Sequence, residues 1–315
     1  MLGKIVIDGK DTKMENPNLR NLVAEVSIAK PRIWLPQKIV GGSRGRVPDN
    51  AQLTNWNQFK ASSHKSASTG GRESTDRTRE YSLKIGLLNC GAKKNIIRSL
   101  LKRGVTVYEL PWNFDPFGSN KDLKRGVAPE EGFPSARSST QQTTINSRTR
   151  SEHRRGGNWR QDPEFEIPKL DGLVISNGPG DPKMAKETIQ IIKKSMDRKL
   201  PTFGICLGNQ LLALAAGGDT YKLKFGHRAQ NQPTIEVKSG RCYITTQNHG
   251  FAVSEKKLPA GFARWFYNAN DNTNEGIIHK SLPFFSIQFH PEAAPGPTDT
   301  EFLFDYFLER ITKHK

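Results

Sequence analysis

The chain has 315 residues, of which 35% are hydrophobic, and its 48 Lys and Arg against 31 Asp and Glu give a formal charge of +17. This length allows one to three domains, and the absence of any run of 18 apolar residues excludes a transmembrane helix. The three cysteines are too few and too scattered for a disulfide scaffold or a zinc site, so we predict no metal ligands and a reducing, cytoplasmic setting.

The first third of the chain contains little that predicts a core. Residues 1–35 include strand-like pieces, KIVID and LVAEVSI, but are too short to fold alone. Residues 36–82 are polar and poor in branched apolar side chains, so we expect a disordered linker. The same composition recurs at 116–166, which we expect to be a disordered insertion. Segments 36–80 and 116–166 carry only +6 of the net charge, so the positive charge is diffuse.

Between and after these segments, strands alternate with helices. Short apolar runs predict strands at 83–89, 105–110 (ending before Pro111), 170–176, 201–205 and 284–289. Helical spacing predicts three helices, with Ile96, Ile97, Leu100 and Leu101 on the first, Ala185, Ile189, Ile192 and Met196 on the second, and 207–218 as the third. This alternation predicts a parallel sheet with helices on both faces.

The last third changes to short β segments, TIEV, RCYITT and GIIH, ahead of the final strand. Gly104 and the pair Gly217–Gly218 stand where helices end. Thr298 and Glu301 form a capping-box pattern before an amphipathic C-terminal helix.

The sequence GICLGN places Cys206 between a strand and a helix, with Gly204 and Gly208 on either side. This is the nucleophile-elbow pattern with sulfur in place of oxygen. The start of a helix favours a thiolate, which is the nucleophilic form of cysteine. A buried structural cysteine is the alternative for an isolated residue, and it is our interpretation of Cys90 and Cys242.

A thiolate nucleophile needs a base, and the base needs an orienting group. His290 and Glu292, separated by a proline, follow the strand FFSIQF directly. Strand ends of open α/β sheets carry ligand sites, so we predict a Cys206–His290–Glu292 triad. Taken alone, a histidine after a strand is more often a hydrogen-bonded surface group.

The loop GPGDP after the strand at 170–176 contains Gly178 and Gly180. Glycines let backbone N–H groups approach a ligand, so this loop could supply oxyanion donors, although an ordinary turn has the same composition. It lacks the Lys-Ser/Thr end of a phosphate-binding loop.

Together the three motifs resemble the class I (triad) glutamine amidotransferases. The stretches FGICLGNQLLALAAGGDTYKLKFGHRAQNQP, TTQNHGFAV and FSIQFHPEAAPGPTD are similar to the glutaminase subunit or domain of carbamoyl-phosphate synthetase. The resemblance covers about 83–313 and implies a flavodoxin-like α/β fold for 83–315, with 1–35 as the end of a truncated N-terminal domain. Asn89 stands where the family usually has Asp.

The resemblance also implies roles for individual residues. Cys206 would be the nucleophile, His290 the base and acid, and Glu292 its partner, with oxyanion N–H groups at Gly178 and Leu207. Residues at the positions that hold glutamine in the family are Gly178, Gly180, Leu207, Gln210, Asn248, Gly250 and Phe251.

The partner implied by the resemblance is a carbamoyl-phosphate synthetase large subunit or fused synthetase domain, which would use ATP, Mg²⁺ and bicarbonate; we predict no cofactor in this chain itself. The stretches SGRCYITTQNHGFAV and SLPFFSIQFHPE look closer to the fused eukaryotic pyrimidine-pathway form. We therefore expect this chain to be a fragment of such a protein. Two alternatives are a non-catalytic regulatory module, suggested by the truncated N-terminal domain, and a nucleic-acid-binding protein, suggested by charge alone; we predict neither a nucleic-acid nor a membrane partner.

Overall fold

The computed structural model describes residues 16, 19–36, 53–54, 83–118 and 167–314. Every described helix and strand belongs to one compact unit, built from the chain before residue 118 and the chain after residue 165. The strand-like piece KIVID, and most of the two segments predicted to be disordered, lie outside the described residues. The division of the chain into three domains stays a prediction.

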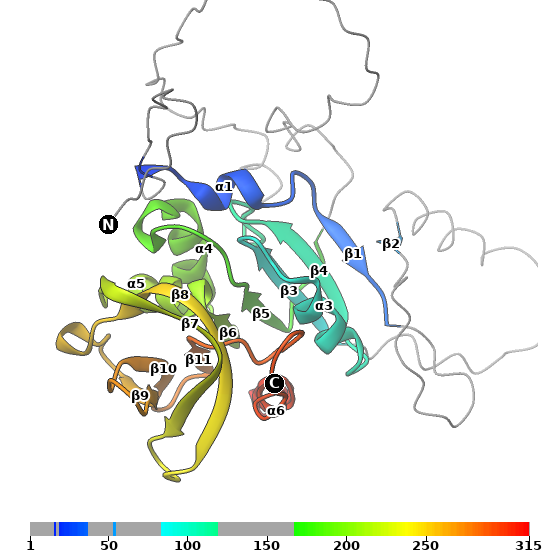
Figure 1. Cartoon of the computed structure of the whole chain (residues 1–315). Helices are drawn as coiled ribbons and strands as arrows, with labels where there is room; N and C mark the ends of the chain where they lie inside the picture. Colours follow the sequence, from blue (N-terminus) through cyan, green and yellow to red (C-terminus); the bar gives the residue numbers. More distant parts are fainter. Residues whose placement is uncertain (1–15, 17–18, 37–52, 55–82, 119–166, 315) are drawn as a thin grey trace, which may run out of the picture. The chain divides into compact units, whose positions relative to one another are not determined.

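A parallel sheet forms the centre of the unit (Figure 1). Its five strands follow the predicted alternation, and neighbouring strands pair in parallel. In spatial order they are β4 (Thr106–Pro111), β3 (Lys84–Asn89), β5 (Gly172–Ile175), β6 (Thr202–Ile205) and β11 (Phe284–Ile287). Strand β4 includes Pro111, one residue beyond the predicted end.

Helices cover both faces of this sheet, as predicted (Figure 1). One face carries α3 (Lys94–Leu101) and α6 (Phe302–Lys313), which are joined by an ion pair of 2.7 Å between Arg103 Nε and Asp305 Oδ1. The other face carries α4 (Lys186–Asp197) and α5 (Leu207–Ala215). A short 3₁₀ helix, η3 (Pro182–Met184), precedes α4. None of the helices in the described ranges is long and apolar enough to cross a bilayer.

Aromatic side chains fill the space between the sheet and α6. Phe203 of β6 stacks on Phe285 of β11 with ring centroids 4.8 Å apart, and Phe304 of α6 meets Phe203 edge-on at 6.0 Å. All three rings are fully buried. Gly172 lets α6 approach β5, because a Cβ there would lie 2.7 Å from Ile311 Cδ1. This packing fixes the sheet edge that carries the elbow and the final strand.

Antiparallel strands extend the sheet beyond β11. They are β10 (Asn274–His279), β9 (Phe262–Asn268), β7 (Thr220–Glu236) and β8 (Cys242–Val253), with a 3₁₀ turn η4 (Glu255–Lys257) after β8. The β7–β8 hairpin is much longer than the predicted pieces TIEV and RCYITT. Most of β7 is exposed or half-buried and polar, so no apolar alternation marks it in the sequence.

The opposite edge of the sheet is formed by the N-terminal part of the chain. Strand β1 (Arg32–Trp34) pairs antiparallel with β4, and β2 (Leu53–Thr54) pairs with β1. The piece LVAEVSI was predicted as a strand and is instead the short helix α1 (Leu22–Val26). Its N-cap Asn21 accepts a hydrogen bond of 3.2 Å from the Ala24 amide, which favours a helical turn over an extended segment.

Two further local predictions were wrong. Ala185 and Ile192 are buried as predicted, but Ile189 and Met196 are only half-buried, and Thr188, Ile191 and Ser195 are buried beside Ile192 instead. The Thr188 hydroxyl donates to the Trp112 carbonyl and the Ser195 hydroxyl to the Ile192 carbonyl, so both polar groups are satisfied in the core. The capping box before α6 is absent, since Glu301 makes no side-chain cap and pairs with Lys102 at 3.1 Å.

A buried polar network ties β1 to the centre of the sheet. Glu109 of β4 accepts hydrogen bonds from Trp34 Nε1 at 2.9 Å and Asn89 Nδ2 at 2.6 Å. The Asn89 amide oxygen accepts from the Gly91 and Ala92 amides, which fixes the turn after β3. Asn89 therefore acts as donor and acceptor at once, which a carboxylate in its place could not do.

Replacing Asn89 by Asp would place a second carboxylate against Glu109. We expect Asn89→Asp to lower the free energy of unfolding by about 2 kcal/mol at pH 8. The loss of unfolding free energy should be smaller at pH 5. The like charge of Glu109 would raise the folded-state pKa of the new carboxyl group, and the protein regains stability as the pH falls through that pKa and the group is protonated. Urea unfolding at both pH values measures this, with Asn272→Asp on an exposed turn as control. Wild-type stability of Asn89→Asp at pH 8 would contradict the assigned donor role.

Candidate active site

The turn from β6 into α5 has the geometry of a nucleophile elbow. Cys206 occupies it with φ 56° and ψ −101°, a strained conformation for a residue with a side chain. A Cβ on Gly204 would lie 2.4 Å from the Gly208 carbonyl oxygen, and one on Gly208 would lie 2.3 Å from that of Ile175. The flanking glycines are therefore required by close backbone contact, as the sequence predicted.

Cys206 caps the N-terminus of α5 and is buried. Its amide donates to the Ile287 carbonyl at 2.8 Å, and its carbonyl accepts from the Asn209 amide at 3.1 Å. These bonds attach the elbow to β11 as well as to α5.

His290 and Glu292 meet Cys206 from the end of β11. The His290 amide donates to the Thr246 carbonyl at 2.9 Å, and its Nδ1 lies 2.7 Å from Glu292 Oε1. Burial lowers the pKa of His290, but the neighbouring Cys206 side chain and the Glu292 carboxylate outweigh it and raise this pKa to about 10. Burial raises the pKa of Glu292, but His290 and Lys93 together bring it below its usual value. His290 and Glu292 thus form a buried ion pair beside Cys206.

Two residues that the sequence analysis did not single out support Glu292. Lys93 Nζ lies 3.4 Å from Glu292 Oε1, and Asn95 Nδ2 donates to the Glu292 carbonyl. Both come from the start of α3, far from Glu292 in sequence. Lys93 offsets the burial of the Glu292 charge.

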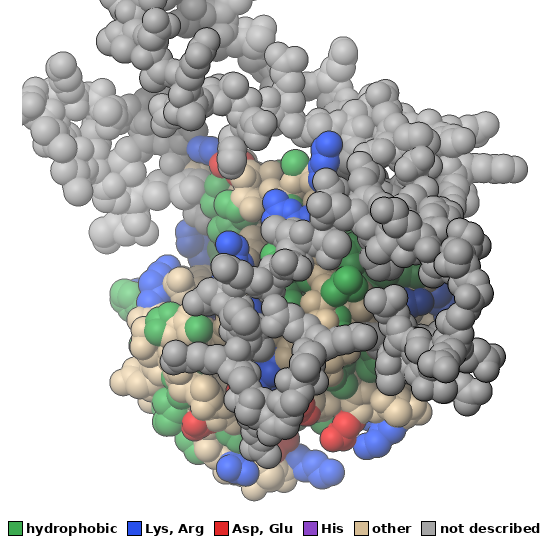
Figure 2. Space-filling model, turned by 90° about the vertical axis from the view of Figure 1, so that its right-hand side faces the viewer, with side chains coloured by type: hydrophobic (Ala, Val, Ile, Leu, Met, Phe, Trp, Pro, Cys, Tyr) green, Lys and Arg blue, Asp and Glu red, His purple; other side chains and the backbone are tan. Residues whose placement is uncertain are grey.

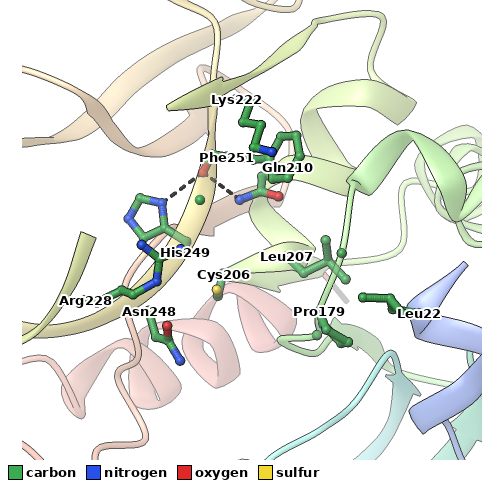
Figure 3. A pocket seen from close by; sticks show the side chains of 13 residues that line it. Leu22, Pro179, Cys206, Leu207, Gln210, Lys222, Arg228, Asn248, His249 and Phe251 are labelled. Carbon is green, nitrogen blue, oxygen red and sulfur yellow. Dashed lines mark hydrogen bonds between the residues drawn. The ribbon is translucent and has the colours of Figure 1, made fainter. Parts of the chain in front are cut away.

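A pocket of about 280 Å³ opens over Cys206 (Figure 3). In Figure 3 the β7–β8 hairpin, with Arg228, Asn248 and His249, lies on one side of the sulfur, and Pro179, Leu207 and Leu22 lie on the other. All seven residues predicted to hold glutamine line the pocket together with Cys206. The lining residues that were not predicted are Leu22, Pro179, Lys222, Arg228 and His249.

Gly178 and Leu207, the two residues predicted to supply oxyanion N–H groups, lie next to each other beside Cys206. A Cβ on Gly178 would lie 2.7 Å from Leu207 Cδ2 and 2.1 Å from the Cys90 carbonyl oxygen, so only glycine fits there. Leu207 is the first residue of α5. Backbone amides at such positions can stabilise a developing oxyanion.

A buried amide network lies beneath the pocket. Gln210 Nε2 donates to the Phe251 carbonyl at 2.9 Å and lies 3.1 Å from Gln288 Oε1. Gln288 Nε2 in turn points at Cys206 Sγ from 3.7 Å. Gln288, which directly follows β11, carried no signal in the sequence beyond its place next to His290.

The Lys and Arg side chains visible in Figure 2 lie apart on that face, with Asp and Glu near some of them.

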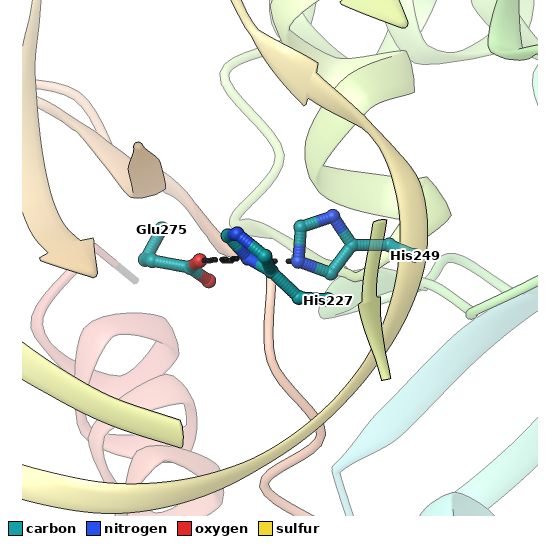
Figure 4. Close-up of side chains that lie close together, drawn as sticks. All are labelled: His227, His249 and Glu275. Carbon is teal, nitrogen blue, oxygen red and sulfur yellow. Dashed lines mark hydrogen bonds and ion pairs between the residues drawn. The ribbon is translucent and has the colours of Figure 1, made fainter. Parts of the chain in front are cut away.

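Within the described residues, one cluster has donor atoms close enough to hold a metal ion (Figure 4). It consists of His227, His249 and Glu275, whose ligand atoms lie within 4.8 Å of one another. None of these three residues was predicted to have a functional role.

A strained cysteine at the start of a helix, a histidine–glutamate pair at the end of the neighbouring strand and a pocket over the sulfur form the arrangement typical of α/β enzymes with a thiol nucleophile. The chain belongs to the class-I glutamine amidotransferases, whose family model matches residues 86–310.

Several known proteins are similar to this chain. The multifunctional protein pyr-3 of Neurospora crassa is 38% identical over 95% of the chain, which spans 12% of that protein. The mitochondrial carbamoyl-phosphate synthase [ammonia] of Aquarana catesbeiana is 35% identical over the whole chain, which spans 15% of it. The chain thus corresponds to a small part of these relatives. A putative GMP synthase protein from Thermoplasma acidophilum shares the fold, with a TM-score of 0.52 and 19% identity over 75% of this chain and 97% of that one.

Replacing Glu292 by Gln keeps the shape of the triad but removes the charge beside His290. We expect the pKa of His290 to fall, and iodoacetamide to alkylate Cys206 at pH 7 about tenfold more slowly, because the imidazolium supports the thiolate less well. Peptide mass spectrometry measures the rate, with the exposed thiol of Cys242 in the same sample as control. An unchanged rate at Cys206 would show that Glu292 does not act through His290.

Proposed function

We propose that this chain is the glutaminase component of a carbamoyl-phosphate synthetase. The observation that carries the proposal is the buried Cys206–His290–Glu292 triad at the base of the pocket. The family match supports glutamine as substrate, and the name of the similar Aquarana protein supports carbamoyl phosphate as the final product.

In the proposed reaction, the Cys206 thiolate attacks the side-chain amide carbon of glutamine. The amide oxygen takes up negative charge and is stabilised by the N–H groups of Gly178 and Leu207. The His290 imidazolium gives its proton to the departing nitrogen, so ammonia leaves and a glutamyl thioester remains on Cys206. His290, now neutral, takes a proton from water, which attacks the thioester and releases glutamate.

The pocket walls would hold the rest of the substrate. Gly180, Gln210, Asn248, Gly250 and Phe251 line the cavity and are placed to contact glutamine. Arg228 and Lys222 add two positive groups to the lining, which suits an α-carboxylate.

The ammonia would pass to a synthetase, as a large subunit or a fused domain, which uses ATP, Mg²⁺ and bicarbonate. The product would supply pyrimidine or arginine synthesis. All three cysteines are unpaired, which favours a reducing compartment such as the cytosol.

A second candidate is a non-catalytic regulatory part of the same complex. It is favoured by the similarity to a relative named as ammonia-dependent. The presence of Cys206 in an intact elbow favours the catalytic role instead.

Replacing Cys206 by Ala separates the two candidates. We expect the variant to release no measurable glutamate from glutamine, because no thioester can form, while a complex with the synthetase still makes carbamoyl phosphate from ammonia. A coupled glutamate assay and a carbamoyl-phosphate assay measure the two activities. Cys242→Ala, outside the pocket, is the control. A wild-type protein that is inactive towards glutamine, alone and with the synthetase, would leave only the regulatory role.

A further inference from the structure

A cluster of titratable side chains adjoins the pocket, whose lining includes its member His249, and takes no part in the triad (Figure 4). His227 comes from β7, His249 from β8 and Glu275 from β10, so the cluster joins three strands. Glu275 is fully buried, and its Oε2 has no hydrogen-bond partner among the described residues. Such a carboxylate needs a nearby positive charge.

His227 lies between two carboxylates. Its Nε2 is 3.0 Å from Asp271 Oδ2, and its Nδ1 is 3.2 Å from Glu275 Oε1. The hydrogen bond to Glu275 raises the pKa of His227 and, with Asp271, outweighs the lowering by burial, so this pKa reaches about 9. Both ring nitrogens can then donate, one to Asp271 and one to Glu275, and this hydrogen bond offsets part of the burial that raises the pKa of Glu275 to about 7.

The cluster is connected to the pocket through two side chains. Gln247 Oε1 lies 3.0 Å from His227 Nδ1 and 3.0 Å from His249 Nε2. His249 Nδ1 lies 2.9 Å from the Phe251 carbonyl, which also accepts from Gln210. Burial lowers the pKa of His249 to about 3.

The pairing of β7 with β8 gives the cluster a second connection to the pocket. Beside the pocket the strands are in register over His227–Arg228–Ala229 and Gln247–Asn248–His249, with irregularities on both sides. Successive strand residues point to opposite faces, so Arg228 and Asn248 face away from His227 and Gln247. Both Arg228 and Asn248 line the pocket.

We propose that His227 is a positioning residue for glutamine binding: held between Asp271 and Glu275, it fixes the short paired stretch of β7 and β8 that carries Arg228 and Asn248 on its other face. His227 touches neither the reacting atoms nor the nucleophile. It therefore sets the affinity for substrate and leaves the chemical step unchanged. The inference rests on the proposed glutaminase function.

Kinetics of Glu275→Gln and His227→Gln test the proposal in the full chain. We expect the KM for glutamine to rise about tenfold while kcat stays within about twofold, because a misplaced wall weakens binding without touching the triad. Calorimetric titration of glutamine into the same variants carrying Cys206→Ala should show the same loss of affinity without turnover. His279→Gln, also on β10 but outside the pocket lining, is the control and should keep the wild-type KM.

Several outcomes would overturn the proposal. Active variants with an unchanged KM, whether or not kcat is reduced, would show that His227 does not position the pocket. A stoichiometric metal ion in the wild-type protein, lost in Glu275→Gln, would show that the cluster binds a metal ion and is not held together by hydrogen bonds from His227. Should both variants fail to fold, Asp271→Asn, at a half-exposed carboxylate, should raise KM about threefold, and no rise would refute the proposal.

If wild-type protein hydrolyses no glutamine, the proposed function fails. If wild-type protein hydrolyses glutamine and these variants have the wild-type KM, only the proposed role of His227 fails.

Discussion

The close contact of three backbone segments at Cys206 determines the rest of the site. Strand β6, the first turn of α5 and the end of β5 approach so closely that neither Gly204 nor Gly208 can carry a side chain. This contact holds Cys206 in a left-handed conformation and directs it into the pocket at the start of a helix. Because the Cys206 amide is bonded to the Ile287 carbonyl, the elbow is fixed relative to β11, and therefore to His290.

Buried charge is the second constraint on this molecule. His290 and Glu292 are almost fully enclosed, and such charges are stable only when they compensate one another. The same solution occurs beside the pocket, where His227 lies between Asp271 and Glu275. In the mechanism that we propose, His290 and Glu292 serve the nucleophile, and His227 with its two carboxylates holds the pocket wall formed by β7 and β8. Both groups of residues lie on or beside β11 and the antiparallel strands beyond it. The residues proposed to bind glutamine and those proposed to react with it are therefore held by the same part of the sheet.

The central sheet and the elbow were predictable because their signals are local. Gly204, Cys206 and Gly208 sit within five residues, and the apolar runs of β3, β5 and β6 are short and unbroken. The β7–β8 hairpin was not predictable at its full length, since its polar residues are stabilised by partners far away in sequence. The contributions of Lys93, Gln288 and the His227 cluster to the site were not predicted for the same reason. Each contacts a residue that only tertiary folding brings near. Helix α1 was misread because Val23 and Val26 favour strands, whereas the Asn21 cap decides the conformation.

The proposed glutaminase reaction depends on covalent chemistry at Cys206. The most direct test is to mix the protein with labelled glutamine, quench in acid and identify the labelled peptide by mass spectrometry. We predict a glutamyl thioester on the peptide that contains Cys206, absent when Cys206 is replaced by Ala. Rapid release of glutamate with no adduct on this peptide at any quench time, or an adduct that persists in Cys206→Ala, would contradict the account.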